Sequence, residues 1–566
     1  MTDVLVDALE EVRGRLASVS LPLVLPGADR ARAARTELLG QLDDYVLPRL
    51  HRIDAPLLAV VGGSTGAGKS TLVNSLVRRR VSEPGVLRPT TRSPVLAFNP
   101  ADAGWFDDAR ILPGLARTST ASRDPGSLQL VAVDSVPVGL AVLDAPDIDS
   151  VEARNRTLAS QLLAAADLWL FVTSAARYAD QVPWDFLHAA AERSAAVAVV
   201  LDRIPLGARE EVAGHLRQML DERGLPGSPL FTVAERPVDQ DGLLPGSAVA
   251  EIRGWLDGLA ADAQARAAVV RQTLEGAVGS VVVRSGEVAE AHAAQLETVA
   301  RLRADVHRAY EEARRDVAEA SADGTLLRGE VLARWQEFVG TGELLRALES
   351  RVGRVRDRVS GWFRGRPPQV ERVAVAVESG LESLLLEHAE AAAERTWRSW
   401  SSVEAGARLL DSTPPEVALS RASRELRGAA ERSVRDWQKD VLEMVRTEGA
   451  EKRTTARFLA FGVNGLSVAL MIVVFAHTAG VTGAEAGIAG GSAVLGQKLL
   501  EAVFGDQAVR RLAERARQEL DVRVGELYAA EADRYLVVLA GLGLEEAAGE
   551  RLRSAAATVA RLQGEP

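Results

Sequence analysis

The chain has 566 residues, of which 47% are hydrophobic and 26% are charged, so it is long enough for two or more folded domains and too apolar for wholesale disorder. A net charge of −11 excludes a broadly basic surface for nonspecific nucleic-acid binding. This acidic balance predicts no nucleic-acid partner. Cysteine is absent, which excludes disulfides, thiolate metal sites and cysteine nucleophiles. The first residues carry acids where a secretion signal needs a basic start, so we expect a cytoplasmic protein.

Residues 1–50 are predicted to form one or two helices, because apolar side chains recur at helical spacing. Between residues 51 and 250, short apolar runs alternate with polar helical segments. This alternation predicts an α/β domain, with a mostly parallel sheet and helices on both faces. Strands are expected at 57–62, 95–98, 128–133, 138–144, 168–174, 197–202 and 229–233. The third and fourth of these runs are close enough in sequence to predict an antiparallel hairpin.

Strand patterns end near residue 250, and residues 251–450 are long charged segments rich in Ala, Arg, Glu and Leu. Segments of this length predict an extended α-helical bundle or stalk. Residues 506–566 return to charged helix, and we expect them to pack with residues 1–50 and 260–320 as a neck.

An apolar region at residues 451–505 separates the two helical parts, and its stretch Phe458–Ala484 contains no Asp, Glu, Lys or Arg. As a helix, residues 458–476 would reach about 28 Å, close to the thickness of a bilayer core. A second, glycine-rich apolar stretch follows at 486–496. We therefore expect a hairpin over 458–497 that binds membrane lipid. The alternative is a hairpin buried inside a soluble helical bundle.

The most specific motif lies directly after the first predicted strand and before a predicted helix. It has the spacing G-x-x-x-x-G-K-[ST] in its strand–loop–helix context, which indicates a phosphate-binding loop. Its glycines let successive backbone N–H groups face phosphates, and the helix N-terminus adds partial positive charge. The candidate nucleotide-binding residues of this loop are Gly63, Ser64, Thr65, Gly66, Ala67, Gly68, Lys69, Ser70 and Thr71.

Lysine usage supports this interpretation. The chain contains four lysines, Lys69, Lys439, Lys452 and Lys498, and otherwise uses arginine. A surface ammonium is readily replaced by guanidinium, but a compact point charge against phosphates is not. Lys69 therefore stands where phosphate chemistry needs a lysine, neutralising the β- and γ-phosphates.

Two further motifs follow in the order of a nucleotide switch. RPTTRSP at 88–94 places Thr91 in a predicted loop, and DAPD at 144–147 ends a strand in Asp144. We expect Ser70, Thr91 and Asp144 to hold Mg²⁺, and Lys69, Thr91 and Asp144 to be the catalytic residues. An ordinary turn before a strand remains the alternative for the threonines.

GGSTGAGKS, RPTTRSP and DAPD within one domain, followed by long helices and a hydrophobic tip, resemble a bacterial dynamin-like large GTPase. The resemblance implies a P-loop GTPase domain over 51–250, a helical stalk over 251–450, and GTP/GDP and Mg²⁺ as cofactors. It also implies hydrolysis coupled to dimerisation, with itself or with a related GTPase, and to membrane remodelling. The expected location is peripheral to, or inserted by the hairpin into, the inner face of the cell membrane.

Three departures qualify the resemblance. Asp147 replaces the glycine of the usual Asp-x-x-Gly motif, which adds a carboxylate near the γ-phosphate. Asp202 and Arg203 stand at the strand end where [Asn/Thr]-Lys-x-Asp reads guanine, with Pro205 at the base-reading acid. Thr65 replaces a longer polar side chain that positions the attacking water in many dynamins. These departures predict slow or assembly-stimulated hydrolysis. The missing base reader leaves a P-loop ATPase as one alternative, and a hairpin buried in the bundle leaves a soluble GTP-dependent scaffold or regulatory switch as the other.

Overall fold

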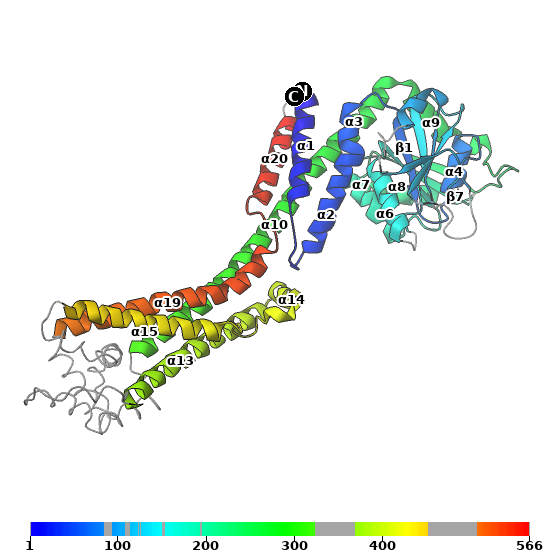
Figure 1. The fold of residues 1–566 in the computed structure, drawn as a ribbon. Helices are drawn as coiled ribbons and strands as arrows, with labels where there is room; N and C mark the ends of the chain where they lie inside the picture. The colour runs from blue at the N-terminus through cyan, green and yellow to red at the C-terminus, as the bar shows by residue number, and fades with distance from the viewer. Residues whose placement is uncertain are drawn as a thin grey trace, which may run out of the picture. The chain divides into compact units, whose positions relative to one another are not determined.

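The computed structural model describes residues 2–83, 93–107, 112, 114–122, 124, 126–149, 153–192, 195–205, 207–322, 368–450 and 506–564. The chain divides into two compact units (Figure 1). The first comprises residues 1–21, 26–294 and 545–566, and the second comprises 22–25 and 295–544. The predicted hairpin at 458–497 lies outside the described residues. None of the helices within the described ranges is long and apolar enough to cross a membrane.

An eight-stranded sheet forms the centre of the first unit, in the order β3-β4-β2-β5-β1-β6-β7-β8. All neighbouring strands are parallel except β2 and β5, which are antiparallel. The strands are β1 (Leu57–Gly63), β2 (Val95–Phe98), β3 (Ala116–Thr118), β4 (Ser127–Ala132), β5 (Leu140–Asp144), β6 (Leu168–Ser174), β7 (Ala196–Ile204) and β8 (Leu230–Ala234).

The predicted hairpin between the third and fourth apolar runs is wrong, because β2 lies between β4 and β5. The segment joining β4 to β5 crosses over β2, and β2 therefore supplies the antiparallel partner of β5. The short edge strand β3 was not predicted either, since its residues, Ala116, Arg117 and Thr118, lack an apolar run. The other strand positions follow the predicted runs closely.

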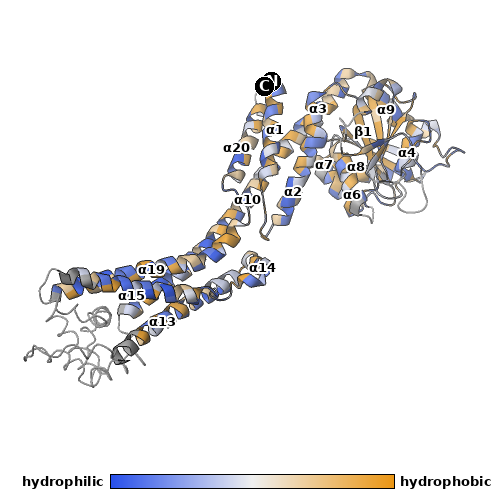
Figure 2. Cartoon of the chain, in the orientation of Figure 1, coloured by the Kyte–Doolittle hydropathy of each residue, from blue (hydrophilic) through white to orange (hydrophobic). Residues whose placement is uncertain are grey.

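Helices cover both faces of the sheet, as predicted, because successive side chains of each strand point to opposite faces. Leu58 and Val60 of β1 pack in one apolar cluster with α6, α7 and α8, whereas Leu57 and Ala59 pack in another with α4 and α9. Figure 2 shows β1 as strongly hydrophobic and the surrounding helices as mixed. The helical elements are α4 (Lys69–Leu76), η2 (Pro100–Asp102), α5 (Ala103–Phe106), α6 (Ala153–Ala164), α7 (Gln181–Glu192), α8 (Arg209–Glu222), η3 (Gly246–Ala248) and α9 (Ala250–Ala261).

A separate helical cluster of the first unit joins the two ends of the chain. Its apolar residues come from N-terminal helices, the first part of α10 and the C-terminal helix. Arg49, Tyr45 and the backbone N–H of Leu58 all bind the buried carboxylate of Asp167, which ties these helices to the sheet. Burial raises the pKa of Asp167, opposed by Arg49 and these hydrogen bonds. The helices are α1 (Thr2–Ser18), α2 (Ala28–Gln41), η1 (Leu42–Val46), α3 (Leu47–His51), α10 (Ala263–Ala322) and α20 (Ala548–Gly564).

The second unit is a helical bundle. The C-terminal part of α10 packs with the other long helices in one apolar cluster, at whose centre Trp400 is fully buried. Trp400 donates its indole N–H to the carbonyl of Leu302, at 3.2 Å. The remaining elements are α13 (Pro368–Ser401), α14 (Glu404–Ser412), η5 (Pro415–Val417), α15 (Leu426–Ala450) and α19 (Asp506–Ala540). The predicted fold class, an α/β P-loop domain with a helical bundle, is therefore confirmed.

Candidate nucleotide-binding site

The predicted phosphate-binding loop connects the end of β1 to the start of α4. Gly63, Gly66 and Gly68 have φ angles of 151°, 76° and 99°, which side chains rarely adopt. A Cβ on Gly63 would lie 2.0 Å from the carbonyl oxygen of Val172, and one on Gly68 would lie 2.1 Å from Oδ2 of Asp202. The loop therefore needs glycine at these two positions, both for its turn and for its close approach to β6 and β7.

The side chain of Lys69 points back into this loop and is buried. Its Nζ donates to the carbonyl oxygens of Gly63 and Ser64, each at 3.0 Å, and forms an ion pair with Asp147. An ammonium has three N–H donors, so these three oxygens use all of them. The lysine is thus held at the loop by a buried carboxylate of the segment that follows β5.

Asp144 is fully buried at the end of β5, next to the start of α4. Its Oδ2 accepts the hydroxyl of Ser82 at 2.6 Å, and Ser70 also hydrogen-bonds to this carboxylate. Burial raises the pKa of Asp144, opposed by both hydrogen bonds and by Lys69. Its Oδ1 has no hydrogen-bond donor within the described residues. A buried carboxylate oxygen without a donor, beside a serine hydroxyl, fits a hard cation such as Mg²⁺.

The segment that follows β5 carries a second carboxylate, in addition to Asp147, and this carboxylate binds the middle of the loop. Asp149 Oδ1 accepts both the backbone N–H and the hydroxyl of Thr65, each at 2.6 Å. Arg177 forms an ion pair with Asp149 at 2.8 Å and donates to the carbonyl oxygen of Thr65 at 3.0 Å. Partial burial alone would raise the pKa of Asp149, but the Thr65 hydrogen bonds and Arg177 outweigh it and lower the pKa.

The end of β7 approaches the loop at Gly68. Asp202 is buried there and accepts the backbone N–H of Arg203 at 2.8 Å. Burial raises the pKa of Asp202 to about 6. Arg203 has φ of 55°, an unusual value for a residue with a side chain, at an irregularity of β7 between Leu201 and Ile204. Pro205 follows, at the position that a base-reading acid occupies in the [Asn/Thr]-Lys-x-Asp motif.

The structure brings most of the predicted site residues together. Residues 63–71 lie beside Asp144, Asp147 and Asp202, whereas Thr91 lies outside the described residues, in the segment 84–92. The site predicted from the sequence did not include Ser82, Asp149 or Arg177. The only sequence feature that pointed to Asp149 is its position two residues after Asp147. Nothing in the sequence distinguished Ser82.

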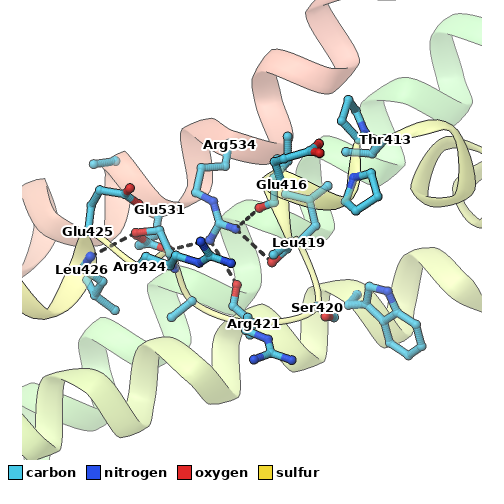
Figure 3. A pocket seen from close by; sticks show the side chains of 18 of the residues that line it. Thr413, Glu416, Leu419, Ser420, Arg421, Arg424, Glu425, Leu426, Glu531 and Arg534 are labelled. Carbon is cyan, nitrogen blue, oxygen red and sulfur yellow. Dashed lines mark hydrogen bonds and ion pairs between the residues drawn. The ribbon is translucent and has the colours of Figure 1, made fainter.

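A cavity of about 920 Å³ lies in the second unit and shares no residue with this site. Figure 3 shows Arg534 of α19 reaching toward Leu419 and Arg421 in the segment between α14 and α15. Arg534 donates to the carbonyl of Arg421 at 3.1 Å and pairs with Glu531, which accepts the backbone N–H of Ser423 at 2.9 Å. Arg534 and Glu531 thus bind the chain segment that forms the cavity wall. Because both charged side chains are used in this way, we assign the nucleotide site to the first unit.

The fold and the site geometry define a P-loop α/β domain joined to a helical bundle. No family model matches the chain. A curated relative, "Probable transmembrane GTPase FZO-like, chloroplastic" from Arabidopsis thaliana, is 25% identical over 134 residues. That match covers 23% of this chain and 13% of the plant protein, so the chain spans only a small part of its relative's length.

Solved structures resemble the chain at lower identity. One, described as an oligomerised bacterial dynamin pair for the long-range sensing and tethering of membranes, is 9% identical. It covers 99% of this chain and 95% of its own, with a TM-score of 0.44. Another, Era in complex with MgGDPNP and nucleotides of 16S ribosomal RNA, is 19% identical and covers 36% of this chain and 56% of its own, with a TM-score of 0.24. The curated relative is described as a GTPase, and one of the solved structures is described as a bacterial dynamin pair.

Proposed function

We propose that this chain is a dynamin-like GTPase that binds GTP with Mg²⁺ at residues 63–71 and couples its hydrolysis to dimerisation and membrane binding. The observation that carries the proposal is the phosphate-binding loop itself. A glycine-dependent turn places one buried lysine, Lys69, beside the buried strand-end carboxylate of Asp144. A buried cation and a buried acid at the carboxyl edge of a parallel sheet are the arrangement that phosphates with a metal require.

In this proposal each group has a separate role. The loop N–H groups and Lys69 bind the phosphates, and Ser70, Asp144 and Thr91 hold Mg²⁺. The metal would neutralise charge on the β- and γ-phosphates. Asp202 and Arg203 line the base side of the site, and Thr65 lies where the attacking water is positioned. Because Thr65 is short and already bound by Asp149, slow or assembly-stimulated hydrolysis follows.

Guanine is proposed because the curated relative is described as a GTPase. The competing candidate is a P-loop ATPase, favoured by Pro205 at the position of the base-reading acid. A competition experiment decides between them: the full-length protein is loaded with mant-GTP in Mg²⁺, and unlabelled GTP or ATP is added. GTP is expected to displace the probe at a concentration at least tenfold lower. Equal displacement by ATP would contradict the guanine assignment.

The membrane part of the proposal rests on residues 458–497, which lie outside the described residues. Flotation of the full-length protein with anionic liposomes tests it in the presence of GTP, GDP or no nucleotide. We expect the protein to float with the liposomes, peripherally or by an inserted hairpin. Protein that stays in the soluble fraction under every condition, with a protease-resistant hairpin in lipid-free buffer, would instead support the soluble scaffold.

A further inference from the structure

The segment after β5 places two carboxylates on the phosphate-binding loop. Asp147 pairs with the ammonium of Lys69, and Asp149 accepts the backbone N–H of Thr65 at 2.6 Å. Between them, Ile148 is fully buried and donates its backbone N–H to the carbonyl oxygen of Gly63 at 3.4 Å. Three consecutive residues therefore contact the loop at three different points.

These contacts use the donors that a bound phosphate would use. In a phosphate-binding loop, the lysine ammonium and the backbone N–H groups are the groups that hold phosphate oxygens. Here the anionic oxygens come from the chain itself. All three N–H donors of Lys69 are engaged, and one of them is engaged by a carboxylate. A triphosphate cannot reach the ammonium without displacing either a backbone carbonyl or Asp147.

We propose that Asp147–Asp149 form an acidic plug that occupies the phosphate site and must leave before a triphosphate binds. Displacement of Asp147 is favoured over displacement of a carbonyl. Gly63 is the last residue of β1 and Ser64 follows it directly, whereas Asp147 lies in the irregular segment after β5. The inference rests on the proposed function, since it concerns regulation of the same nucleotide site.

The plug is anchored from a third element. Arg177, in the turn after β6, pairs with Asp149 and donates to the carbonyl oxygen of Thr65. It also pairs with Asp180 at 2.8 Å. The arginine thus holds the plug and the loop together, so release of the plug requires the Arg177–Asp149 pair to separate or to move as one body.

The energetic consequence is a reduced apparent affinity. When only a fraction of the protein has an open site, the apparent Kd rises by the inverse of that fraction. The charge-assisted hydrogen bond between Lys69 and Asp147 is lost when the plug opens, and its loss corresponds to about a tenfold change in affinity or more. Asp147→Asn keeps an oxygen for Lys69 but removes the charge, so it should weaken the plug without leaving the lysine unpaired.

The test measures mant-GTP binding in Mg²⁺ to the full-length protein and to Asp147→Asn, Asp149→Asn and the double variant. Each single variant is expected to bind about tenfold more tightly than the wild type, and the double variant more tightly still. The matched control is Asp102→Asn, which removes a buried carboxylate that accepts the backbone N–H of Gly139 at 2.8 Å, outside the loop. Its affinity should stay within about twofold of the wild type.

Stopped-flow kinetics separate a plug from simple charge repulsion. A plug that opens before binding makes the observed rate for the wild type level off with increasing mant-GTP, and the Asp147→Asn variant should level off at a higher rate. A wild-type rate that rises linearly, with no gain of affinity in either single variant, would overturn the plug and leave the nucleotide site standing. Absence of mant-GTP binding in the wild type and in every variant would overturn the proposed function itself. Thermal melts confirm that each variant folds, and Asp149→Asn remains a valid test if Asp147→Asn does not fold.

Discussion

Acidic residues lie beside the phosphate-binding loop at two strand ends, in the segment after β5 and near the end of β7, and the two ends differ in how these charges are compensated. After β5, the carboxylates face cations and donors: Asp147 pairs with Lys69, and Asp149 binds Thr65 and Arg177. Near the end of β7, Asp202 is buried against Gly68 and is stabilised by the backbone N–H of its neighbour Arg203. The pKa of Asp149 is consequently lowered, whereas that of Asp202 is raised to about 6.

This difference shows how similar acids take opposite roles at one edge of a sheet. A compensated carboxylate stabilises the fold and competes with other anions for the same donors. A carboxylate with too few donors and cations lowers the stability of the fold when it is ionised. Once it is protonated, it repels an incoming phosphate less. The β5 end therefore acts on phosphate binding, and the β7 end acts on the pH dependence of stability.

The largest expected effect comes from removing the cation of the β5 end. Lys69→Ala should lower mant-GTP affinity at least about a thousandfold, or about 4 kcal/mol, because no other described side chain supplies an ammonium to the loop. Equilibrium binding by fluorescence anisotropy measures this loss. Lys439→Ala, an exposed lysine of the second unit, is the matched control and should bind as the wild type does.

The same variant also leaves Asp147 buried without its cation, which should lower thermal stability. Adding Asp147→Asn to Lys69→Ala should restore stability but not binding. Retention of micromolar affinity by Lys69→Ala would contradict the assignment of the loop to phosphate.

A medium effect is expected at the β7 end, with a sign that depends on pH. The pKa of Asp202 is raised from an ordinary 3.8 to about 6, so the folded state binds more protons between these values and stability falls as pH rises through them. Asp202→Asn should therefore stabilise the protein by about 2–3 kcal/mol at about pH 8 and give little gain at about pH 4. Thermal midpoints of the variant and the wild type at both pH values measure the difference.

The comparison gives this prediction its control. Asp149→Asn makes the same chemical change at the β5 end, where the pKa is lowered, so it should destabilise the protein at about pH 8. Equal signs for the two substitutions would show that the strand ends do not differ in compensation.

Periodicity and motif spacing were enough to predict the α/β domain, the helices on both faces and the loop at residues 63–71. These features depend on local patterns, which repeat along β1, β6 and β7 and place Asp144 at a strand end. The insertion of β2 between β4 and β5 was not predictable, because strand order depends on which apolar faces pack best in three dimensions. The same holds for β3, whose three residues carry no apolar signal.

The contacts at the site show a similar division. Residue types and spacing predicted that Lys69, Ser70 and Asp144 meet, since they follow a known strand–loop–helix geometry. They did not predict that Asp149 reaches Thr65, or that Ser82 reaches Asp144, at 2.6 Å in each case. The residues of the two pairs are 84 and 62 positions apart in the sequence, respectively. No motif fixes how the intervening segments fold back.

The smallest expected effect concerns Arg177, which joins the turn after β6 to the β5 end. Its side chain is about one-third exposed and pairs with both Asp149 and Asp180, so solvent screens part of each interaction. Arg177→Gln should lower stability by about 0.5–1 kcal/mol near neutral pH. Because the pKa of Asp149 is lowered in the folded protein, its ionised carboxylate stabilises the fold at pH values above the ordinary pKa of an aspartate. This stabilisation is lost as the pH falls through the lowered pKa. The difference in stability between Arg177→Gln and the wild type should therefore shrink in acid. Thermal melts over that range measure this, and because the same arginine anchors the acidic plug, the variant should also bind mant-GTP more tightly. A variant that loses stability equally at every pH would separate Arg177 from Asp149 and assign its role to the carbonyl of Thr65 alone.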